Sequence, residues 1–391
     1  MSAQNIANTC VFIAKEYGVQ PGTSWGTLSD RKLRTWWNQN GCNSVVKASA
    51  PAAGAPALNA GAVSGGTASL VTATGTQPTH SRVYLDSWAG VSRPDLLREA
   101  DRVMFAFWGL TDAGAVTGRD NGVEQALAAA KVPHVSAALG GWGNCANFSA
   151  LFADPAKRAT VVGNIVAACA QAGFDGLDVD WEYPSTAGDP ANLLAFLVAL
   201  RAAAPAGFHI SIAGVSDPSS YYSSIASGLA AAVDAVHIMT YDYVGPWDST
   251  AGFNSSLPDA QSSVSQYATL GFPVAKLFVG AAFYGREATV NSVSLNFGIG
   301  QKAVAWKELK YSEIAATRLG QPGWIEVWVD GRKSPWLYNP SQLHVLTYED
   351  AQAIAAKRTW ALDAGLGGVM CWAWNQDDAA GTLGKALIGV N

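Results

Sequence analysis

The chain has 391 residues, of which 10% are aromatic and 14% are charged, and its formal net charge is −5 at pH 7. This length suits a single α/β barrel with an appendage, and the low charge excludes a basic surface for nucleic acid. The sequence contains no apolar run long enough to form a membrane-spanning helix. The 15 Trp, 12 Tyr and 13 Phe favour a ligand with flat faces, such as a sugar ring, because aromatic rings stack on such faces.

The N-terminal part of the chain divides at residues 48–80, which contain no Asp, Glu, Lys or Arg and consist mainly of Ala, Gly, Ser, Thr and Pro. Such a composition predicts a flexible linker. The preceding segment, residues 1–47, is too short for a core of its own. We expect it to be either a small carbohydrate-binding module or an extension that packs on the barrel. No apolar stretch follows a basic segment in the first twenty residues, so a secretory signal peptide is either absent or not included in this sequence.

The five cysteines have no spacing typical of metal ligands, so the sequence indicates no metal site. Their odd number leaves at least one thiol free. Cys10 and Cys42 bracket the N-terminal segment and form either a disulfide or two buried free thiols. The five histidines are scattered along the chain, and we expect His134, His209 and His237 to be hydrogen-bonded core residues of predicted strands.

From residue 81 to residue 391, short β-rich runs alternate with Ala- and Leu-rich helical stretches, the pattern of repeated βα units. We therefore predict an α/β fold of the (β/α)8 TIM barrel type for the catalytic part. The interval between the seventh and eighth strands is far longer than one helix and its loops require, so we expect a small α+β subdomain inserted at about residues 288–345. The eight predicted strands cover residues 82–85, 102–107, 134–139, 176–180, 209–213, 235–239, 276–281 and 368–372.

The chemistry is concentrated in residues 174–184, which read Phe-Asp-Gly-Leu-Asp-Val-Asp-Trp-Glu-Tyr-Pro. Alternate side chains of a strand share a face, so Asp178, Asp180 and Glu182 line up at intervals of about 7 Å. The intervening apolar side chains lie on the other face, toward the helices. The acidic face of a barrel strand points into the barrel and not into bulk water, so the sequence predicts a carboxylate cluster instead of an ordinary solvated strand.

Crowding and partial burial raise the pKa of at least one of these carboxyl groups. A raised pKa keeps a carboxylic acid protonated near neutral pH, as a general acid requires. Glu182 is the last of the three and therefore lies nearest the C-terminal mouth of the barrel, where barrel active sites form. We predict that Glu182 is the proton donor.

The same segment resembles the strand-four motif of glycoside hydrolase family 18, Asp-Gly-x-Asp-x-Asp-x-Glu, and the resemblance extends over roughly residues 81–391. The third strand carries Ala138 where the family's Ser-x-Gly-Gly motif has Ser, so we expect the hydrogen bonds of Asp178 to differ from those of the family. The sixth strand runs into Met-Thr-Tyr-Asp, similar to the family's Met-x-Tyr-Asp motif. Residues 283–286 and 367–372 are similar to the family's seventh and eighth strands.

The resemblance implies a chitinase that hydrolyses β-1,4-linked N-acetylglucosamine polymers by a retaining, substrate-assisted mechanism with no metal or organic cofactor. In that mechanism Glu182 protonates the glycosidic oxygen while the acetamido oxygen of the sugar attacks its own anomeric carbon. An oxazolinium ion forms, and Glu182 then activates water. Asp180 accepts a hydrogen bond from the acetamido N–H, Asp178 holds a shared proton beside it, and Tyr241 donates its hydroxyl to the acetamido oxygen.

The resemblance also implies a set of substrate-binding residues around the cleavage point. Trp372 forms the floor beneath the distorted sugar, and Trp142 and Trp247 are aromatic platforms on the leaving-group side. Arg286 binds a sugar on the other side of the cleavage point or, alternatively, forms a structural ion pair. The remaining members are Asp242, which binds a sugar hydroxyl or the glycosidic region, and Met239 and Tyr284, which line the pocket of the acetamido methyl group.

Chitin and chito-oligosaccharides are the implied partners, and we expect an extracellular monomer that binds neither nucleic acid nor membrane. Three alternatives stay open: a catalytically weak chitin-binding lectin, an endo-β-N-acetylglucosaminidase acting on N-glycans, and a structural or inhibitory protein on the same barrel. The complete set of acidic residues and Tyr241 argues against a lectin. Trp181, the aromatic platforms and the insertion favour chitin over N-glycans.

Overall fold

The computed structural model describes residues 80–294 and 296–390. The predicted N-terminal module at residues 1–47 lies outside the described residues, and so does the predicted linker apart from His80, which begins the first strand. The proposed pairing of Cys10 and Cys42 lies there too. The three described cysteines are buried and free: Cys145, Cys169 and Cys371.

Eight parallel strands close into a barrel, which confirms the predicted fold class. The sheet runs in the order β1, β14, β8, β7, β6, β5, β4 and β2, and β1 also pairs with β2, so the barrel has no open edge. A short strand, β3 (Val116–Thr117), adds to β2 in antiparallel orientation. The barrel strands are β1 (His80–Asp86), β2 (Arg102–Leu110), β4 (Val135–Gly140), β5 (Gly176–Asp180), β6 (His209–Gly214), β7 (Ala235–Ile238), β8 (Leu277–Ala282) and β14 (Gly368–Trp372).

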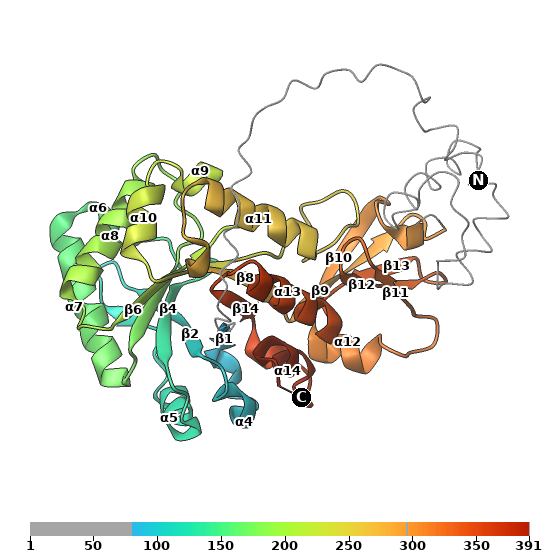
Figure 1. Cartoon of the computed structure of the whole chain (residues 1–391), viewed down its shortest axis with the longest axis horizontal. Coiled ribbons are helices and arrows are strands. Elements are labelled where there is room, and N and C mark those ends of the chain that lie inside the picture. Colours follow the sequence, from blue (N-terminus) through green and yellow to red (C-terminus); the bar gives the residue numbers. More distant parts are fainter. Residues whose placement is uncertain (1–79, 295, 391) are drawn as a thin grey trace, which may run out of the picture.

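Helices surround the barrel strands on the outside (Figure 1). The longest of them is capped at both ends by its own sequence. Asp154 accepts hydrogen bonds from the amides of Ala156 and Lys157, and Gly173 ends the helix with a φ of 71°, which glycine adopts without strain. None of the described helices is both long and apolar enough to cross a membrane. The helices outside the insertion are α4 (Pro94–Leu97), α5 (Asn121–Ala130), α6 (Phe148–Ala153), α7 (Pro155–Ala172), α8 (Asp189–Ala203), α9 (Ser219–Tyr222), α10 (Ala226–Ala232), α11 (Leu257–Thr269), α13 (Ala351–Asp363) and α14 (Thr382–Ile388).

Strand β5 turns its apolar side chains outward, as its alternation predicts. Trp181 packs edge-on against Phe148 and Phe152, with ring centroids 5.8 and 5.5 Å away. Leu177 and Val179 are buried in the same cluster between the strands and the helices. Because successive side chains alternate, this packing fixes the direction of the carboxylates on the other face, which point into the barrel.

The insertion between β8 and β14 is a five-stranded antiparallel sheet with one helix, which lies beside the barrel (Figure 1). It begins at Tyr284, earlier than the expected residue 288, because only Phe283 separates it from the barrel strand β8. The strand order is β10, β9, β13, β12 and β11. The elements are β9 (Tyr284–Val290), β10 (Ala303–Lys310), α12 (Tyr311–Thr317), β11 (Ile325–Val329), β12 (Ser334–Asn339) and β13 (His344–Thr347).

A buried ion pair ties both ends of the insertion to the barrel. Glu349, two residues after β13, accepts a hydrogen bond of 2.6 Å from the amide of Ala282, the last residue of β8. It also pairs with Lys357 of α13 at 2.8 Å. Burial raises the pKa of Glu349 and lowers that of Lys357. Glu349 and Lys357 each need the other as a counter-charge, because burial of an unpaired charge costs free energy.

Candidate active site

Asp178 lies within the barrel and is held by side chains from three other strands. Ser211 of β6 donates a hydrogen bond of 2.6 Å to Oδ1, and Tyr84 of β1 donates one of 2.6 Å to Oδ2. His237 Nδ1 of β7 lies 3.1 Å from Oδ1. All four side chains are buried. The carboxyl group of Asp178 is therefore fixed in position before any ligand binds.

The sequence departure at Ala138 has a structural counterpart on the opposite side of β5. Ala138 of β4 pairs with Asp178 and supplies no hydroxyl group, whereas Ser211 pairs with Asp178 from β6 and supplies one. The hydroxyl thus comes from the other neighbouring strand. The sequence alone did not indicate Ser211 or Tyr84, because both lie far from Asp178 along the chain.

The predictions for the histidines have mixed outcomes. His237 is a buried, hydrogen-bonded residue of β7, as expected, and burial lowers the pKa of its imidazole. His134 is wrong as a core prediction, because it precedes β4 and its side chain is 55% exposed, in an ion pair with Asp175. His209, at the start of β6, is partly buried, so its exposure is intermediate between that of His237 and that of His134.

Asp180 and Glu182 continue the row toward the mouth of the barrel, and both have raised pKa values. Burial raises the pKa of Asp180 well above its usual value, and the charges of Glu182 and Asp178 raise it further. Its Oδ1 is buried with no hydrogen-bond partner among the described residues. Burial also raises the pKa of Glu182, hydrogen bonds with the side chain of Tyr183 and the backbone of Trp142 lower it, and the charge of Asp242 raises it. On balance Glu182 keeps its proton to a higher pH than a free glutamic acid, as a general acid requires.

Tyr241 follows β7 and is buried near the same carboxyl groups. Burial raises the pKa of its hydroxyl well above the usual value, and the charges of Asp180, Asp242 and Glu182 raise it further. The hydroxyl therefore stays protonated and can donate a hydrogen bond. Tyr241 packs in the inner apolar cluster of the barrel, against which the partly buried Met239 also lies.

Asp242 is the centre of a polar group formed with the first residues of the insertion. Tyr284 donates a hydrogen bond of 2.6 Å to its Oδ1, and Arg286 donates two more from Nε and Nη2, at 3.0 and 2.5 Å. The backbone of Asp242 has a φ of 60°, and its amide donates to the side chain of Asn254 at 3.2 Å. The sequence-predicted residues Asp242, Tyr284 and Arg286 thus lie in direct contact.

Arg286 also joins this group to an exposed tryptophan. Its guanidinium lies 5.0 Å from the ring centroid of Trp247 and 3.2 Å from the carboxylate of Glu308. The side chain is largely buried, while Trp247 is 62% exposed. Arg286 is therefore in an ion pair, the alternative that the sequence left open, and at the same time it supports the ring of Trp247.

Trp372, at the end of β14, belongs to an aromatic cluster of which the sequence predicted only Trp372 itself. Phe107 stacks on it with ring centroids 5.2 Å apart and planes at 23°, and Trp88 lies 6.3 Å away. Trp88 is 67% exposed. Its position directly after the first barrel strand was a usable signal, because residues that follow barrel strands lie at the active-site mouth. Phe107 gave no such signal.

A second exposed aromatic surface follows β4 and β5. Trp142 is 80% exposed, and its ring centroid lies 6.4 Å from that of Tyr183 in an edge-on arrangement. Tyr183 in turn lies 5.5 Å from Tyr221. The sequence predicted Trp142 but not the two tyrosines, whose contribution depends on the neighbouring loops meeting at the mouth.

The arrangement can supply a proton to a bound ligand and can stack on flat rings. It contains a partly buried carboxyl group with a raised pKa, a second buried carboxyl group, a protonated tyrosine and several exposed aromatic rings. Within residues 80–294 and 296–390, no group of three or more His, Cys, Asp or Glu side chains could hold a metal ion. These features together define a barrel enzyme of the glycosidase class.

The family is given by comparison with known proteins. The model of the Glycosyl hydrolases family 18 matches residues 80–377, and the chain belongs to this family. A protein described as probable chitinase 2 of Drosophila melanogaster is 31% identical over 364 residues, which cover 79% of this chain and 75% of that protein. Chitinase A1 of Niallia circulans is 29% identical over 284 residues, which cover 61% of this chain but only 40% of that protein.

The fold has close counterparts among solved structures. A chitinase from Rhizomucor miehei superimposes with a TM-score of 0.72 at 25% sequence identity, over 79% of this chain and 99% of that chain.

Proposed function

We propose that the chain is a chitinase that hydrolyses β-1,4-linked N-acetylglucosamine polymers with retention of configuration. The observation that carries the proposal is the inward-facing row of Asp178, Asp180 and Glu182, with raised pKa values at the last two and with Tyr241 beside them. Family membership supports glycoside hydrolysis, and the relatives named above are chitinases.

In the proposed first step, Glu182 gives its proton to the glycosidic oxygen as the bond to the anomeric carbon breaks. The acetamido oxygen of the same sugar forms the new bond to that carbon, which gives an oxazolinium ion and releases the leaving chain. Glu182, now a carboxylate, takes a proton from water as the water attacks the anomeric carbon. The bond from this carbon to the acetamido oxygen breaks, which restores the acetamido group. Two inversions at one carbon retain the β configuration.

Asp180 and Tyr241 act on the acetamido group in this proposal. Asp180 has a buried oxygen without a partner among the described residues, and it accepts the acetamido N–H there. The protonated hydroxyl of Tyr241 donates to the acetamido oxygen. Asp178, held by its three polar neighbours, shares a proton with Asp180 in this proposal. Such fixed groups stabilise the charge that develops in the transition state.

The aromatic residues bind the sugar chain on both sides of the cleavage point. Trp372, with Phe107 against it, forms the floor of the site, and Trp142 and Trp247 supply platforms for the leaving-group side. Asp242 binds a sugar hydroxyl or the glycosidic region. Two further residues complete the pocket, Met239 and Tyr284.

The biological setting follows from the chemistry of the substrate. Chitin is an insoluble polymer that cannot enter a cell, so we place the protein outside the cell as a chitin-binding monomer. The low charge of the chain gives no surface for nucleic acid.

The test uses two hexasaccharides that differ only in their acetyl groups, chitohexaose and its fully deacetylated counterpart. We expect cleavage of chitohexaose with the β-anomer as the first product, followed by NMR, and no cleavage of the deacetylated oligomer, which lacks the acetamido nucleophile. The α-anomer would contradict retention, and cleavage of the deacetylated oligomer would contradict substrate assistance.

The same experiment separates the alternative functions. Binding of chitohexaose without product would support a lectin. Release of glycans from a high-mannose glycopeptide, with no activity on chitohexaose, would support an endo-β-N-acetylglucosaminidase.

A further inference from the structure

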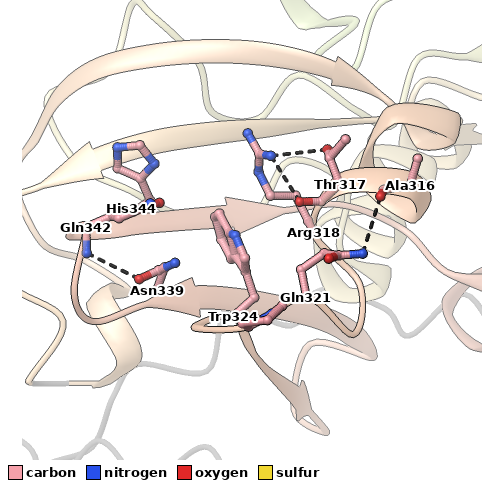
Figure 2. A pocket seen from close by; sticks show the side chains of 9 residues that line it. Ala316, Thr317, Arg318, Gln321, Trp324, Asn339, Gln342 and His344 are labelled. Atoms are coloured by element: carbon pink, nitrogen blue, oxygen red, sulfur yellow. Dashed lines mark hydrogen bonds between the residues drawn. The ribbon is translucent and has the colours of Figure 1, made fainter.

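The inserted subdomain carries a pocket of about 560 Å³ that shares no residue with the carboxylate row. We call it the Trp324 pocket (Figure 2). It is lined by the end of α12, by the loop that leads into β11, and by the turn between β12 and β13. Its volume falls within the range of small-molecule pockets, about 300–1,000 Å³.

The Trp324 pocket lies on the opposite face of the inserted sheet from the candidate active site. Arg286 of β9 points toward Asp242 on the barrel. Its neighbour Glu287 must point to the other face, since side chains of a strand alternate. There Glu287 contacts Arg318 at 2.6 Å and His344 at 3.0 Å, and both of these residues line the pocket. A ligand in this pocket would therefore not occupy the catalytic cleft.

A tryptophan ring stands in the middle of the pocket lining. Figure 2 shows Trp324 between Arg318 and Gln321 on one side and His344 and Asn339 on the other. The Arg318 guanidinium lies 5.2 Å from the ring centroid of Trp324, and the His344 ring lies 6.5 Å away. These contacts fix the orientation of the ring while leaving it partly exposed. A held, partly exposed aromatic ring is a platform for a flat apolar face.

The charge around the pocket is balanced and does not favour an anion. Glu287 pairs with the guanidinium of Arg318 and also contacts Nδ1 of His344, so the charge of Arg318 already has a carboxylate partner. The lining residues themselves include no carboxyl group. A neutral ligand suits this environment better than a phosphate or a carboxylate, which would compete with Glu287 for Arg318.

Amide groups supply hydrogen-bonding sites next to the ring. Asn339 is only 2% exposed, and its Oδ1 accepts from the amides of Ser341 and Gln342 and from the hydroxyl of Ser341. Its Nδ2 carries the donor groups of the amide, and Asn339 lines the pocket. Gln321 uses Nε2 on the carbonyl of Ala316 at 3.4 Å, which leaves its side-chain oxygen as an acceptor.

We propose that the Trp324 pocket binds a neutral pyranose unit of a sugar chain, with the sugar packed on Trp324 and its hydroxyl groups bonded to Asn339, Gln321 and Gln342. A pyranose ring combines an apolar face with hydroxyl groups around its rim, which matches an aromatic platform surrounded by amides. The pocket holds a sugar chain to the enzyme outside the cleft. The site concerns binding alone and needs no catalytic group. That its natural ligand is chitin rests on the proposed function.

The test measures binding by calorimetry to the full chain carrying Glu182→Gln, so that the sugar is not consumed. Two probes are used separately, chitohexaose and cellohexaose. Adding Trp324→Ala should remove one binding event or weaken it at least about tenfold, because the stacking platform is lost. Trp328→Ala, which removes a partly exposed tryptophan of β11 outside the pocket lining, is the matched control and should leave that event unchanged.

A second variant keeps the test valid if Trp324→Ala disturbs folding. Asn339→Asp retains the oxygen that accepts the three turn hydrogen bonds but removes the Nδ2 donor, so it should weaken the same event several-fold. Gln352→Ala, an exposed side chain of α13, is its control. Loss with chitohexaose alone would assign the pocket to acetylated sugars, and loss with both probes would assign it to neutral pyranoses in general.

The proposal is overturned if neither pocket variant changes the binding of either probe. This outcome can be told apart from a failure of the proposed function. If the protein is not a hydrolase, wild-type protein forms no product, yet the event that depends on Trp324 remains. If only the pocket proposal fails, the wild-type protein hydrolyses chitohexaose, but calorimetry shows no binding event that depends on Trp324.

Discussion

The two faces of strand β9 carry similar groups of side chains with different surroundings. On one face Arg286 pairs with Asp242 and lies 5.0 Å from the ring of Trp247. On the other face Glu287 pairs with Arg318, which lies 5.2 Å from the ring of Trp324. Each face therefore combines an arginine, an acid and a tryptophan that is at least partly exposed.

The two faces of β9 differ in the residues that neighbour these groups. Asp242 is close enough to Glu182 to raise its pKa, so the first face continues into the proposed proton donor. The residues that line the Trp324 pocket include no carboxyl group. In both proposals an arginine held on a tryptophan by an acid forms a binding surface, and on the first face a nearby acid with a raised pKa adds chemistry.

The largest expected effect comes from Glu182→Gln, which should abolish catalysis at the active-site face of β9. Sugar binding at both faces of β9 should remain. We expect kcat to fall by roughly 10²–10⁴-fold, because glutamine cannot donate a proton to the leaving oxygen. Initial rates on chitohexaose measure the loss, and Glu313→Gln on α12 is a control that changes an exposed glutamate. A loss of less than about tenfold would remove Glu182 from the role of proton donor.

Lys357→Met should weaken the anchoring of the inserted sheet, which includes β9, to the barrel. The substitution leaves Glu349 buried without its cation, and we expect a loss of roughly 3–5 kcal/mol in the free energy of unfolding. Denaturant titration measures this change. The control is Lys307→Met, at an exposed position of β10, which should stay within about 0.5 kcal/mol of the wild type. Equal stabilities of the two variants would contradict the anchoring role of the pair.

A matched pair of tryptophan substitutions compares the faces directly. Trp247→Ala should raise KM for chitohexaose roughly two- to tenfold with little change in kcat, because stacking is lost in the ground state and the transition state alike. Trp324→Ala should change neither constant for short oligomers. The comparison fails if the two substitutions have the same effect on KM.

Asp242→Asn should shift the pH dependence of activity. The proposed reaction needs protonated Glu182, so we expect activity to fall as the pH rises through the pKa of Glu182. The negative charge of Asp242 raises that pKa, and its removal lowers it. The alkaline limb of kcat/KM against pH should therefore move toward lower pH. Asp112→Asn, on an exposed loop, should leave the limb in place, and a shift of the Asp242→Asn limb to higher pH would contradict the assignment.

The smallest effect is expected from Ala138→Ser, which restores the family hydroxyl beside Asp178. Both oxygens of Asp178 already have partners in Ser211, Tyr84 and His237, so kcat/KM should change by less than about fivefold. Ser211→Ala, by contrast, removes a hydroxyl that Asp178 uses and should cost more. A large gain in activity for Ala138→Ser would mean that Ser211 does not replace the missing hydroxyl.

The sequence by itself determined the barrel and the strand that carries the row of carboxyl groups, because both are encoded in local patterns. Alternation along β5 separated the inward carboxyl groups from Trp181 and its apolar neighbours, and it identified Glu182 as the residue nearest the mouth. The repeated βα pattern located all eight barrel strands to within a few residues. Periodicity reports which face a side chain occupies, and that information lies within a few residues of chain.

Only the tertiary structure decided which distant side chains meet. Tyr84, Ser211 and His237 reach Asp178 from three different strands, because closure of the barrel brings their inward faces together. The same holds for Trp88 beside Trp372, which lie near opposite ends of the barrel sequence and become neighbours when β1 pairs with β14. The Trp324 pocket likewise depends on a helix end, a loop and a turn packing against one another. Contacts of this kind are set by the packing and strand pairing of the whole chain, and no local pattern records them.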